Sequence, residues 1–474
     1  MSLYDILFGP GGIERTLNGI IWGIPAMVLI LGTGIYLSAR CGFLQFAKFG
    51  HIIKNTLGKA FKKSEHKEGT VSPFKAMCTA LAASIGTGNI AGVSGAIALG
   101  GPGAVFWMWI SALLGMCTKY AEVTLAIKFR QKNSKGDYVG GPMYYITNGL
   151  GKKWKGLAVR FAIFGAIASI GTGNLVQVNT IAKTVNTAII GFTPLTDQAQ
   201  TTIAIIIGVI CAVTAAIVLI GGIQRIGDFC ATLVPAMAII FILASIGVII
   251  FRIDQIPAAF AAIFQGAFNP QAVVGGGVGI TIKMAMTKGV ARGIFSNEAG
   301  LGSAPIAHAA ADVDHPVKQG IYGVFEVFMD TVIVCTMTAL VVLLGNGVGG
   351  IEFGNDIGAN LAINGFTAVY GGKIPAVVVA ICLSLFAFTT TLTWALYGSR
   401  CTEFLFGEKA GKPYLVFYCL LIVIGAVTDL SLAWNIADTF NGLMAIPNLI
   451  ALLVLSPIVI KLTREYFDDQ KKLK

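Results

Sequence analysis

Charge is scarce in this sequence. Asp, Glu, Lys and Arg together make up 12% of the 474 residues, which is about half the share found in a typical soluble domain. Hydrophobic residues make up 55%, and the mean hydropathy is +0.78. The chain therefore lacks the polar surface that a soluble protein of this length needs. We predict that lipid and packed apolar helices surround most of it.

Histidine and paired cysteines are also sparse. The chain has four His and nine Cys, no Cys-x-x-Cys occurs, and the His show no metal-ligand spacing. This argues against a transition-metal site or a redox enzyme. The absence of His-Glu-x-x-His and Gly-x-Gly-Asp argues against an intramembrane protease. The net charge of +11 lies in loops between apolar runs, so it indicates orientation in a lipid bilayer and not nucleic-acid binding.

Long apolar runs predict an all-α polytopic membrane protein. A membrane-spanning helix needs about twenty apolar residues, and eleven runs of this kind occur. A polar segment at 352–373 predicts a short helix outside the membrane. The predicted spans are 17–39, 73–99, 103–127, 157–187, 200–221, 228–251, 281–311, 319–345, 374–398, 413–430 and 434–461.

Lys and Arg are distributed unevenly between the loops. They concentrate after the first and third predicted spans and in the C-terminal tail, and they are missing after the second, fourth and tenth. Positive residues favour the cytoplasmic side of a membrane. We therefore predict a multi-pass protein of the cell membrane with its N-terminus outside and its C-terminus in the cytoplasm.

Two predicted spans are interrupted. Residues 84–89 read SIGTGN and residues 296–302 read SNEAGLG. Closely spaced glycines disfavour a continuous helix, and the backbone groups that a break frees need partners inside the membrane. Two such breaks five spans apart are typical of an inverted-repeat transporter. The breaks therefore predict three parts, which are an extra N-terminal span with a basic loop at 1–72, a first repeat at 73–255 and a second repeat at 256–474.

A seven-residue run occurs twice. Residues 83–89 and 168–174 both read ASIGTGN. An inverted repeat does not predict this pairing, because the second copy lies in the fourth span. We expect Asn174 and Gln177, at and just after the second copy, to face the same cavity as the first.

Broken helices expose two kinds of backbone end. Helix N-termini bind carboxylates, whereas C-terminal carbonyls bind cations and ammonium groups. An amino acid zwitterion needs both. We therefore expect the amides of Thr87 and Gly88 to hold a carboxylate, and the groups near Phe295 and Ser296 to hold an ammonium.

Hydroxyl groups cluster in the predicted span 374–398. Thr389 and Thr390 can coordinate sodium through oxygen, but Thr hydroxyls in helices also bond back to their own carbonyls. Phe388 and Trp394 can limit the size of a substrate or simply pack in the interior. Both alternatives remain open from the sequence.

Charged residues inside predicted spans form another group. Glu326 and Asp330 lie four apart and share a helix face, and Arg292 and Glu298 lie in the interrupted span. Intramembrane charge is costly and indicates function. The cluster predicts either structural charge pairing or ion and proton coupling.

Three stretches resemble the alanine/glycine:cation symporter family, which transports small amino acids with sodium. They are 86–93, 289–309 and 386–400. The resemblance covers nearly the whole chain and implies a LeuT-like fold with a five-plus-five inverted repeat and alternating access. It implies sodium-coupled symport of alanine, glycine or both into the cell, no enzymatic activity, and no cofactor beyond the sodium ion. A proton-coupled transporter that uses Glu326 or Asp330 is the alternative, and a channel is a third.

The resemblance also implies individual roles. Asn89 and Ser296, with Ser84, are similar to a second ion site of that fold. The candidate substrate-binding residues are Thr87, Gly88, Asn89, Asn174, Gln177, Phe295, Ser296, Gly300, Phe388 and Trp394. The candidate cation-binding residues are Ala82, Ser84, Ile85, Phe386, Thr389 and Thr390.

Overall fold

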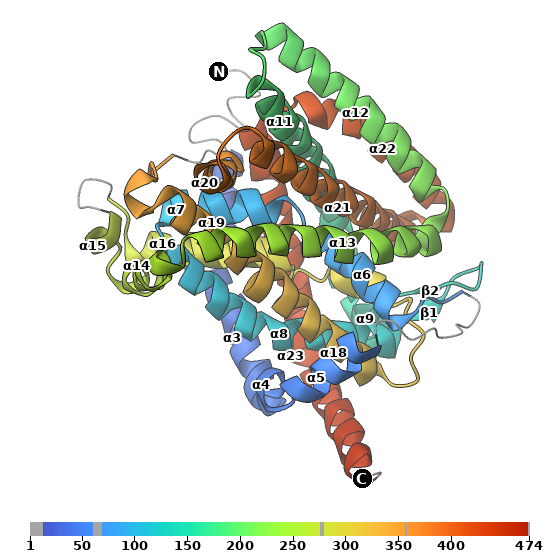
Figure 1. The fold of residues 1–474 in the computed structure, drawn as a ribbon. Coiled ribbons are helices and arrows are strands. Elements are labelled where there is room, and N and C mark those ends of the chain that lie inside the picture. Colours follow the sequence, from blue (N-terminus) through green and yellow to red (C-terminus); the bar gives the residue numbers. More distant parts are fainter. Residues whose placement is uncertain (1–12, 60–68, 275–278, 356–357, 473–474) are drawn as a thin grey trace.

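The protein is a bundle of helices (Figure 1). The structure, a computed structural model, describes residues 13–59, 69–274, 279–355 and 358–472. Nine helical runs of these residues are long and apolar enough to cross a membrane, and a bent pair makes a tenth. The predicted count of eleven is not confirmed. The difference is the interrupted span at 281–311, whose main helix α16 (Ile282–Asn297) has 16 residues.

Most predicted spans coincide with observed helices. Two spans consist of α-helices joined through a π-helical turn. They are α10 (Lys155–Ala168), η5 (Ser169–Leu175) and α11 (Val176–Ile190), and then α18 (Pro316–Val327), η7 (Phe328–Cys335) and α19 (Thr336–Asn346). The other long helices are α3 (Ile24–Arg40), α8 (Gly103–Phe129), α12 (Asp197–Leu219), α13 (Gly222–Phe251), α21 (Ile374–Phe406), α22 (Gly411–Val427) and α23 (Leu430–Lys472).

Shorter elements connect the spans. Helix α20 (Asn360–Tyr370) lies in the segment 352–373, where a short helix was expected, whereas α14 (Ile256–Phe268) was not predicted. A two-stranded antiparallel ribbon, β1 (Gln131–Lys132) and β2 (Tyr138–Val139), follows α8. The remaining helices are α2 (Ile13–Ile21), α4 (Leu44–Ala47), α5 (Phe49–Asn55), α9 (Pro142–Tyr145), η3 (Ile146–Leu150), α15 (Pro270–Val274) and α17 (Ala304–His308), with single 3-10 turns at η1 (Leu57–Lys59), η4 (Lys152–Trp154), η6 (Ile253–Gln255), η8 (Val348–Gly350) and η9 (Glu408–Ala410).

Both sequence interruptions are breaks in the helices. Helix α6 (Pro73–Ser84) stops, residues 85–87 connect it to the next helical segment, and the chain continues as η2 (Gly88–Gly92) and α7 (Val93–Gly100) with a bend of 49°. Helix α16 ends before residues 298–303, and α17 follows. We call 85–87 the first break and 298–303 the second break. Glu298 has a φ of 56°, in the left-handed region, which is uncommon for a residue other than glycine and marks the second break as a tightly constrained turn.

The broken helices lie inside the bundle. Helix α8 packs along α16 and α18, and α21 packs against α6 and α13. Helices α12 and α22 lie side by side at one edge (Figure 1). There α12 exposes Ile206, Ile210 and Ile217, as a lipid-facing helix does. This arrangement keeps the two breaks away from lipid.

Candidate functional site

The first break is held open by side chains. The Gly86 amide donates to Asn89 Oδ1 at 2.9 Å, and the Thr87 amide donates to Gln177 Oε1 at 3.2 Å. Gln177 in turn donates to the Thr172 carbonyl at 2.9 Å. These bonds satisfy backbone groups that would otherwise be unpaired in the membrane, so Asn89 and Gln177 give the break a defined shape.

A ring of oxygens surrounds the Thr390 hydroxyl. Thr390 Oγ1 lies 2.9 Å from the Ala82 carbonyl, 3.5 Å from that of Ile85 and 3.0 Å from that of Phe386. A Cβ on Gly86 would come within 2.4 Å of the same hydroxyl, so the approach of α21 to the first break needs glycine there. Three carbonyls and a hydroxyl are ligands that suit a hard cation.

Thr389 behaves differently from its neighbour. Its hydroxyl donates to the Phe386 carbonyl of its own helix at 3.0 Å, which is the alternative that helix chemistry suggested. The predicted role of Thr389 as a cation ligand remains a prediction, and the structure directs only Thr390 towards the first break.

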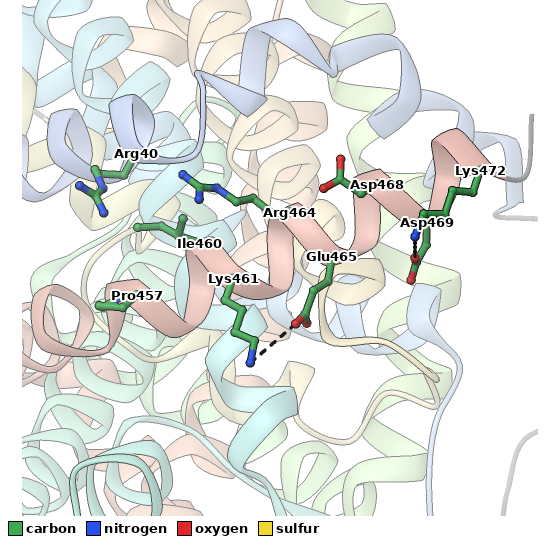
Figure 2. A pocket seen from close by; sticks show the side chains of 9 residues that line it. All are labelled: Arg40, Pro457, Ile460, Lys461, Arg464, Glu465, Asp468, Asp469 and Lys472. Carbon is green, nitrogen blue, oxygen red and sulfur yellow. Dashed lines mark ion pairs between the residues drawn. The ribbon is translucent and has the colours of Figure 1, made fainter.

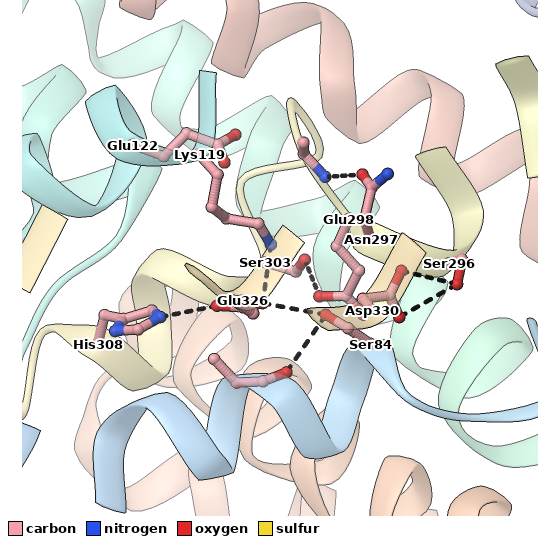
Figure 3. Close-up of polar contacts among 12 residues, drawn as sticks. Ser84, Lys119, Glu122, Ser296, Asn297, Glu298, Ser303, His308, Glu326 and Asp330 are labelled. Atoms are coloured by element: carbon pink, nitrogen blue, oxygen red, sulfur yellow. Dashed lines mark hydrogen bonds and ion pairs between the residues drawn. The ribbon is translucent and has the colours of Figure 1, made fainter. Parts of the chain in front are cut away.

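Asp330 joins the two broken helices, and Figure 3 shows its contact with Ser296. Its Oδ1 accepts from Asn89 Nδ2 at 2.7 Å, and its Oδ2 accepts from Ser296 Oγ at 2.9 Å and from Thr331 Oγ1 at 2.7 Å. All four side chains are buried. Asp330 forms no ion pair with any described residue. A buried carboxylate with only neutral donors attracts a cation or a proton.

The two broken helices meet at Gly88. A Cβ placed on it would lie 3.2 Å from Phe295 Cδ1 and 3.3 Å from Ser296 Cα. Thr87 and Ser296 are fully buried, and Trp394 is 1% exposed. The buried hydroxyl of Thr87 has no hydrogen-bond partner in the described part of the chain. The region thus combines close backbone approach with a polar atom that is available to a ligand.

Four predicted site residues make their described contacts with other parts of the protein. Phe388 packs edge-on against Phe229, Asn174 donates to the Tyr418 carbonyl at 2.7 Å, and the Gly300 carbonyl accepts from Asn448 at 2.9 Å. Ser84 donates to Glu326 at 3.0 Å and is not among the partners of Asp330. These contacts are with residues other than Thr87, Gly88 and Ser296, and the predicted roles of the four residues remain predictions.

The predicted charge cluster divides into separate hydrogen-bonded groups, and Figure 3 shows contacts of Glu298, Glu326 and Asp330. Glu326 and Asp330 share a helix face but bind different partners. Arg292 pairs with Asp438 at 3.2 Å, whereas Glu298 accepts from Ser303 at 2.5 Å. Asp438 was not singled out from the sequence, although a charged residue inside the predicted span 434–461 is a signal that could have identified it.

Arg292 is also part of an aromatic layer. Its guanidinium lies 4.2 Å from the centroid of the Trp434 ring, and that ring lies 4.7 Å from the Phe295 ring. The Arg292 and Asp438 side chains are 16% and 21% exposed, whereas Phe295 is 5% exposed. The ion pair is therefore more accessible than Phe295, and Trp434 contacts both Arg292 and Phe295.

Two pockets lie away from the breaks. One, of about 510 Å³, is formed by the end of α3 and the C-terminal part of α23, where Arg40 and Arg464 are among the lining residues (Figure 2). The other, of about 400 Å³, is largely apolar and lies between α13, α20 and α21. Neither is lined by a predicted site residue, so neither changes the assignment of the site to the breaks.

Comparison with solved structures identifies the fold. The chain superimposes on MhsT, solved in complex with L-phenylalanine, with a TM-score of 0.58 and 14% identity, over 84% of this chain and 99% of the other. At this identity the likeness concerns the fold alone. It supports the predicted LeuT-like fold, while the five-plus-five inverted repeat remains a prediction.

Sequence comparison gives the family. The sodium:alanine symporter family matches residues 12–474. The sodium/alanine symporter AgcS of Methanococcus maripaludis is 45% identical over 96% of this chain and 97% of its own length. The probable sodium/glutamine symporter GlnT of Bacillus subtilis is 36% identical over 96% of this chain and 92% of its own. This protein belongs to the sodium:alanine symporter family, which confirms the predicted family and a role as a transporter.

Proposed function

We propose that the protein is a sodium-coupled symporter that carries alanine, glycine or both into the cell by alternating access. The observation that carries this proposal is the meeting of the two broken helices at Gly88, beside the buried carboxylate of Asp330. The relative AgcS is named a sodium/alanine symporter, which supports the choice of ion and substrate. Uptake of labelled alanine into liposomes, with and without an inward sodium gradient, tests it. Uptake that ignores sodium would contradict the coupling.

Two positions suit a cation. At the first, the carbonyls of Ala82, Ile85 and Phe386 face the Thr390 hydroxyl. At the second, Asn89, Ser296 and the Asp330 carboxylate converge. Oxygen-rich sites with few or no charges match the modest demands of sodium. Because Asp330 supplies a full negative charge, we propose that a cation at the second position is balanced by the protein itself.

The amino acid would bind where the two broken helices meet. The Thr87 hydroxyl has no described partner, and η2 begins at Gly88, so this end of the helix can attract a carboxylate. The rings of Phe295 and Trp394 would limit the side chain to a small one. The predicted orientation, with the N-terminus outside and the C-terminus in the cytoplasm, is part of this proposal.

Substitution of Gly88 by alanine should reduce transport selectively. The added methyl group would lie 3.2 Å from Phe295 Cδ1, in the region where we propose that the substrate side chain binds. We expect uptake of alanine to fall by about tenfold or more and uptake of glycine to fall less, since overpacking costs roughly 1–3 kcal/mol. Competition between labelled alanine and glycine measures this. The control is Gly92→Ala, whose methyl would meet nothing nearer than 3.8 Å. An equal loss for both substrates would argue against this placement.

The Arg292–Asp438 pair should act as a gate. It joins α16 to α23 over the Phe295–Trp434 layer, so Asp438→Asn should impair closure over the substrate. We expect the maximal uptake rate to fall by about tenfold, equivalent to roughly 1.4 kcal/mol, with little change in the half-saturating alanine concentration. The control is Glu403→Gln, because the Arg400–Glu403 pair is similarly exposed but lies within one helix. Equal effects of Asp438→Asn and Glu403→Gln would argue against a gating role of the Arg292–Asp438 pair.

A proton-coupled carrier is the competing function, and the same carboxylate favours it. Asp330 lacks a cationic partner among the described residues, so a proton could replace the sodium ion there. Uptake driven by a pH gradient in sodium-free buffer would support this alternative over the sodium proposal.

A further inference from the structure

Glu326 is a buried carboxylate that the proposed site does not use. It lies on α18 and is 0% exposed. Its Oε1 accepts from Ser84 Oγ at 3.0 Å and from Lys119 Nζ at 3.1 Å, and its Oε2 accepts from His308 Nε2 at 2.9 Å (Figure 3). The three donors come from α6, α8 and α17. One carboxylate therefore connects the half-helix before the first break to the half-helix after the second.

A second contact fixes the orientation of His308. Gln319 Nε2 donates to His308 Nδ1 at 2.8 Å. Because an amide nitrogen can only donate, Nδ1 accepts, and Nε2 carries the proton that is directed at Glu326. Gln319 Nε2 also donates to the Pro73 carbonyl at 3.2 Å. Helix α18 thus holds α6 at its first residue, through Gln319, and at its last residue, Ser84, through Glu326.

The backbone strengthens this connection. The Val71 amide donates to the Ala310 carbonyl at 3.0 Å, and the Asp312 amide donates to the Val71 carbonyl at 2.8 Å. These bonds join the chain just before α6 to the chain just after α17. Helices α6 and α17 are therefore joined both by backbone hydrogen bonds and through the Glu326 side chain of α18.

The connection from Glu326 ends at Ser84, beside the proposed cation position at Thr390. Ser84 is the last residue of α6, and the next carbonyl along the chain is that of Ile85, which faces the Thr390 hydroxyl together with that of Ala82. The described hydrogen bonds of Glu326 are with Ser84, Lys119 and His308. The hydrogen-bonded connection from Glu326 to that position therefore runs through the end of α6.

We propose that Glu326 is a positioning residue for sodium coupling. By holding Ser84 it keeps the end of α6 in the conformation that directs the Ala82 and Ile85 carbonyls towards Thr390, and by holding His308 it makes α6 and α17 move together. The ion pair with Lys119 holds the carboxylate in place. This inference rests on the proposed function, because it assumes that the carbonyls bind the coupling ion.

The test uses variants that remove one contact each. Ser84→Ala removes the bond to the break and leaves the Lys119–Glu326 pair intact. Uptake of alanine into liposomes should need about three- to tenfold more sodium for half-saturation, the effect of one lost hydrogen bond, while the maximal rate stays within about twofold. An unchanged sodium requirement would overturn the proposal, and so would a loss confined to the maximal rate.

A double-mutant cycle separates positioning from direct ligation. If Ser84 acts through Glu326, the variant Ser84→Ala/Glu326→Gln should need no more sodium than Glu326→Gln alone. Additive effects would mean that Ser84 contacts the ion itself, and would overturn the proposal. Glu326→Gln leaves Lys119 buried without its partner, which can prevent folding. Lys119→Met/Glu326→Gln removes both charges and serves as the background in that case.

Hydrogen exchange provides a readout that does not depend on sodium. In Lys119→Met/Glu326→Gln, amides of 82–88 and of 304–309 should exchange faster together, by about the same factor, than in the parent protein. If parent uptake ignores sodium but the two segments still loosen together, the proposed function fails and the positioning role stands. Loosening of one segment alone would refute the role of Glu326 in joining them.

Discussion

Replacing Asp330 by asparagine should abolish sodium-dependent uptake while leaving the fold intact. Asparagine keeps the shape of the side chain, so the protein should still purify as a folded protein. The negative charge that would balance a cation beside Asn89 and Ser296 is lost. We expect the sodium concentration for half-maximal uptake to rise by at least about a hundredfold, equivalent to roughly 3 kcal/mol. Uptake of labelled alanine at graded sodium concentrations measures this.

The matched control for Asp330→Asn is Thr331→Val. It removes one donor to the carboxylate, at 2.7 Å, but keeps the charge, so the sodium requirement should change only a few-fold. If Asp330→Asn retained the sodium dependence of the parent, the carboxylate would have no part in ion coupling. If the parent protein took up alanine under a pH gradient in sodium-free buffer and Asp330→Asn did not, the result would favour proton coupling.

Thr390→Val should have the second largest effect. Valine has nearly the same shape as threonine but removes the hydroxyl that faces the Ala82 and Ile85 carbonyls. We expect the half-saturating sodium concentration to rise by about ten- to a hundredfold, since a polar contact to a charged group contributes roughly 1.5–3 kcal/mol. Thr390→Ser, which keeps the hydroxyl, should restore most of the affinity.

The next residue of α21 provides the control for this variant. The Thr391 hydroxyl donates to the Ala387 carbonyl of its own helix at 3.0 Å and is directed at neither break. Thr391→Val should therefore leave the sodium requirement within about twofold. Similar losses in Thr390→Val and Thr391→Val would show that general packing of α21 explains the effect and that Thr390 has no specific role.

Local sequence patterns were sufficient to find both breaks. Glycines at 86 and 88, and at 300 and 302, lie where the structure interrupts a helix, because a glycine backbone loses most entropy in a helix and tolerates positive φ. The apolar runs predicted nearly all spans for a similarly direct reason, since the thickness of a membrane sets the length of a helix. The run at 281–311 is not confirmed as a span, because α16 ends after 16 residues, and hydropathy alone does not show where a helix ends.

Partners distant in sequence could not be predicted in the same way. The sequence suggested that Ser84 joins a second ion site, but the structure directs it at Glu326. It also suggested that Phe388 lines the substrate site, but the ring packs against Phe229. Each residue lies on a helix whose rotation is decided by the neighbours it packs against, and a residue type alone does not contain that information.

The repeated run ASIGTGN separates the two contributions most clearly. The sequence alone determined that this protein spans a membrane, that two of its helices are interrupted, and to which family it belongs. It could not determine that 83–89 breaks while 168–174 continues as the π-helical turn η5. In the first copy Asn89 and Gln177 accept from the freed amides, whereas in the second Asn174 donates to Tyr418 of α22. Only the tertiary structure supplies those partners, because a backbone in the membrane can leave its helix only where other groups satisfy its hydrogen bonds.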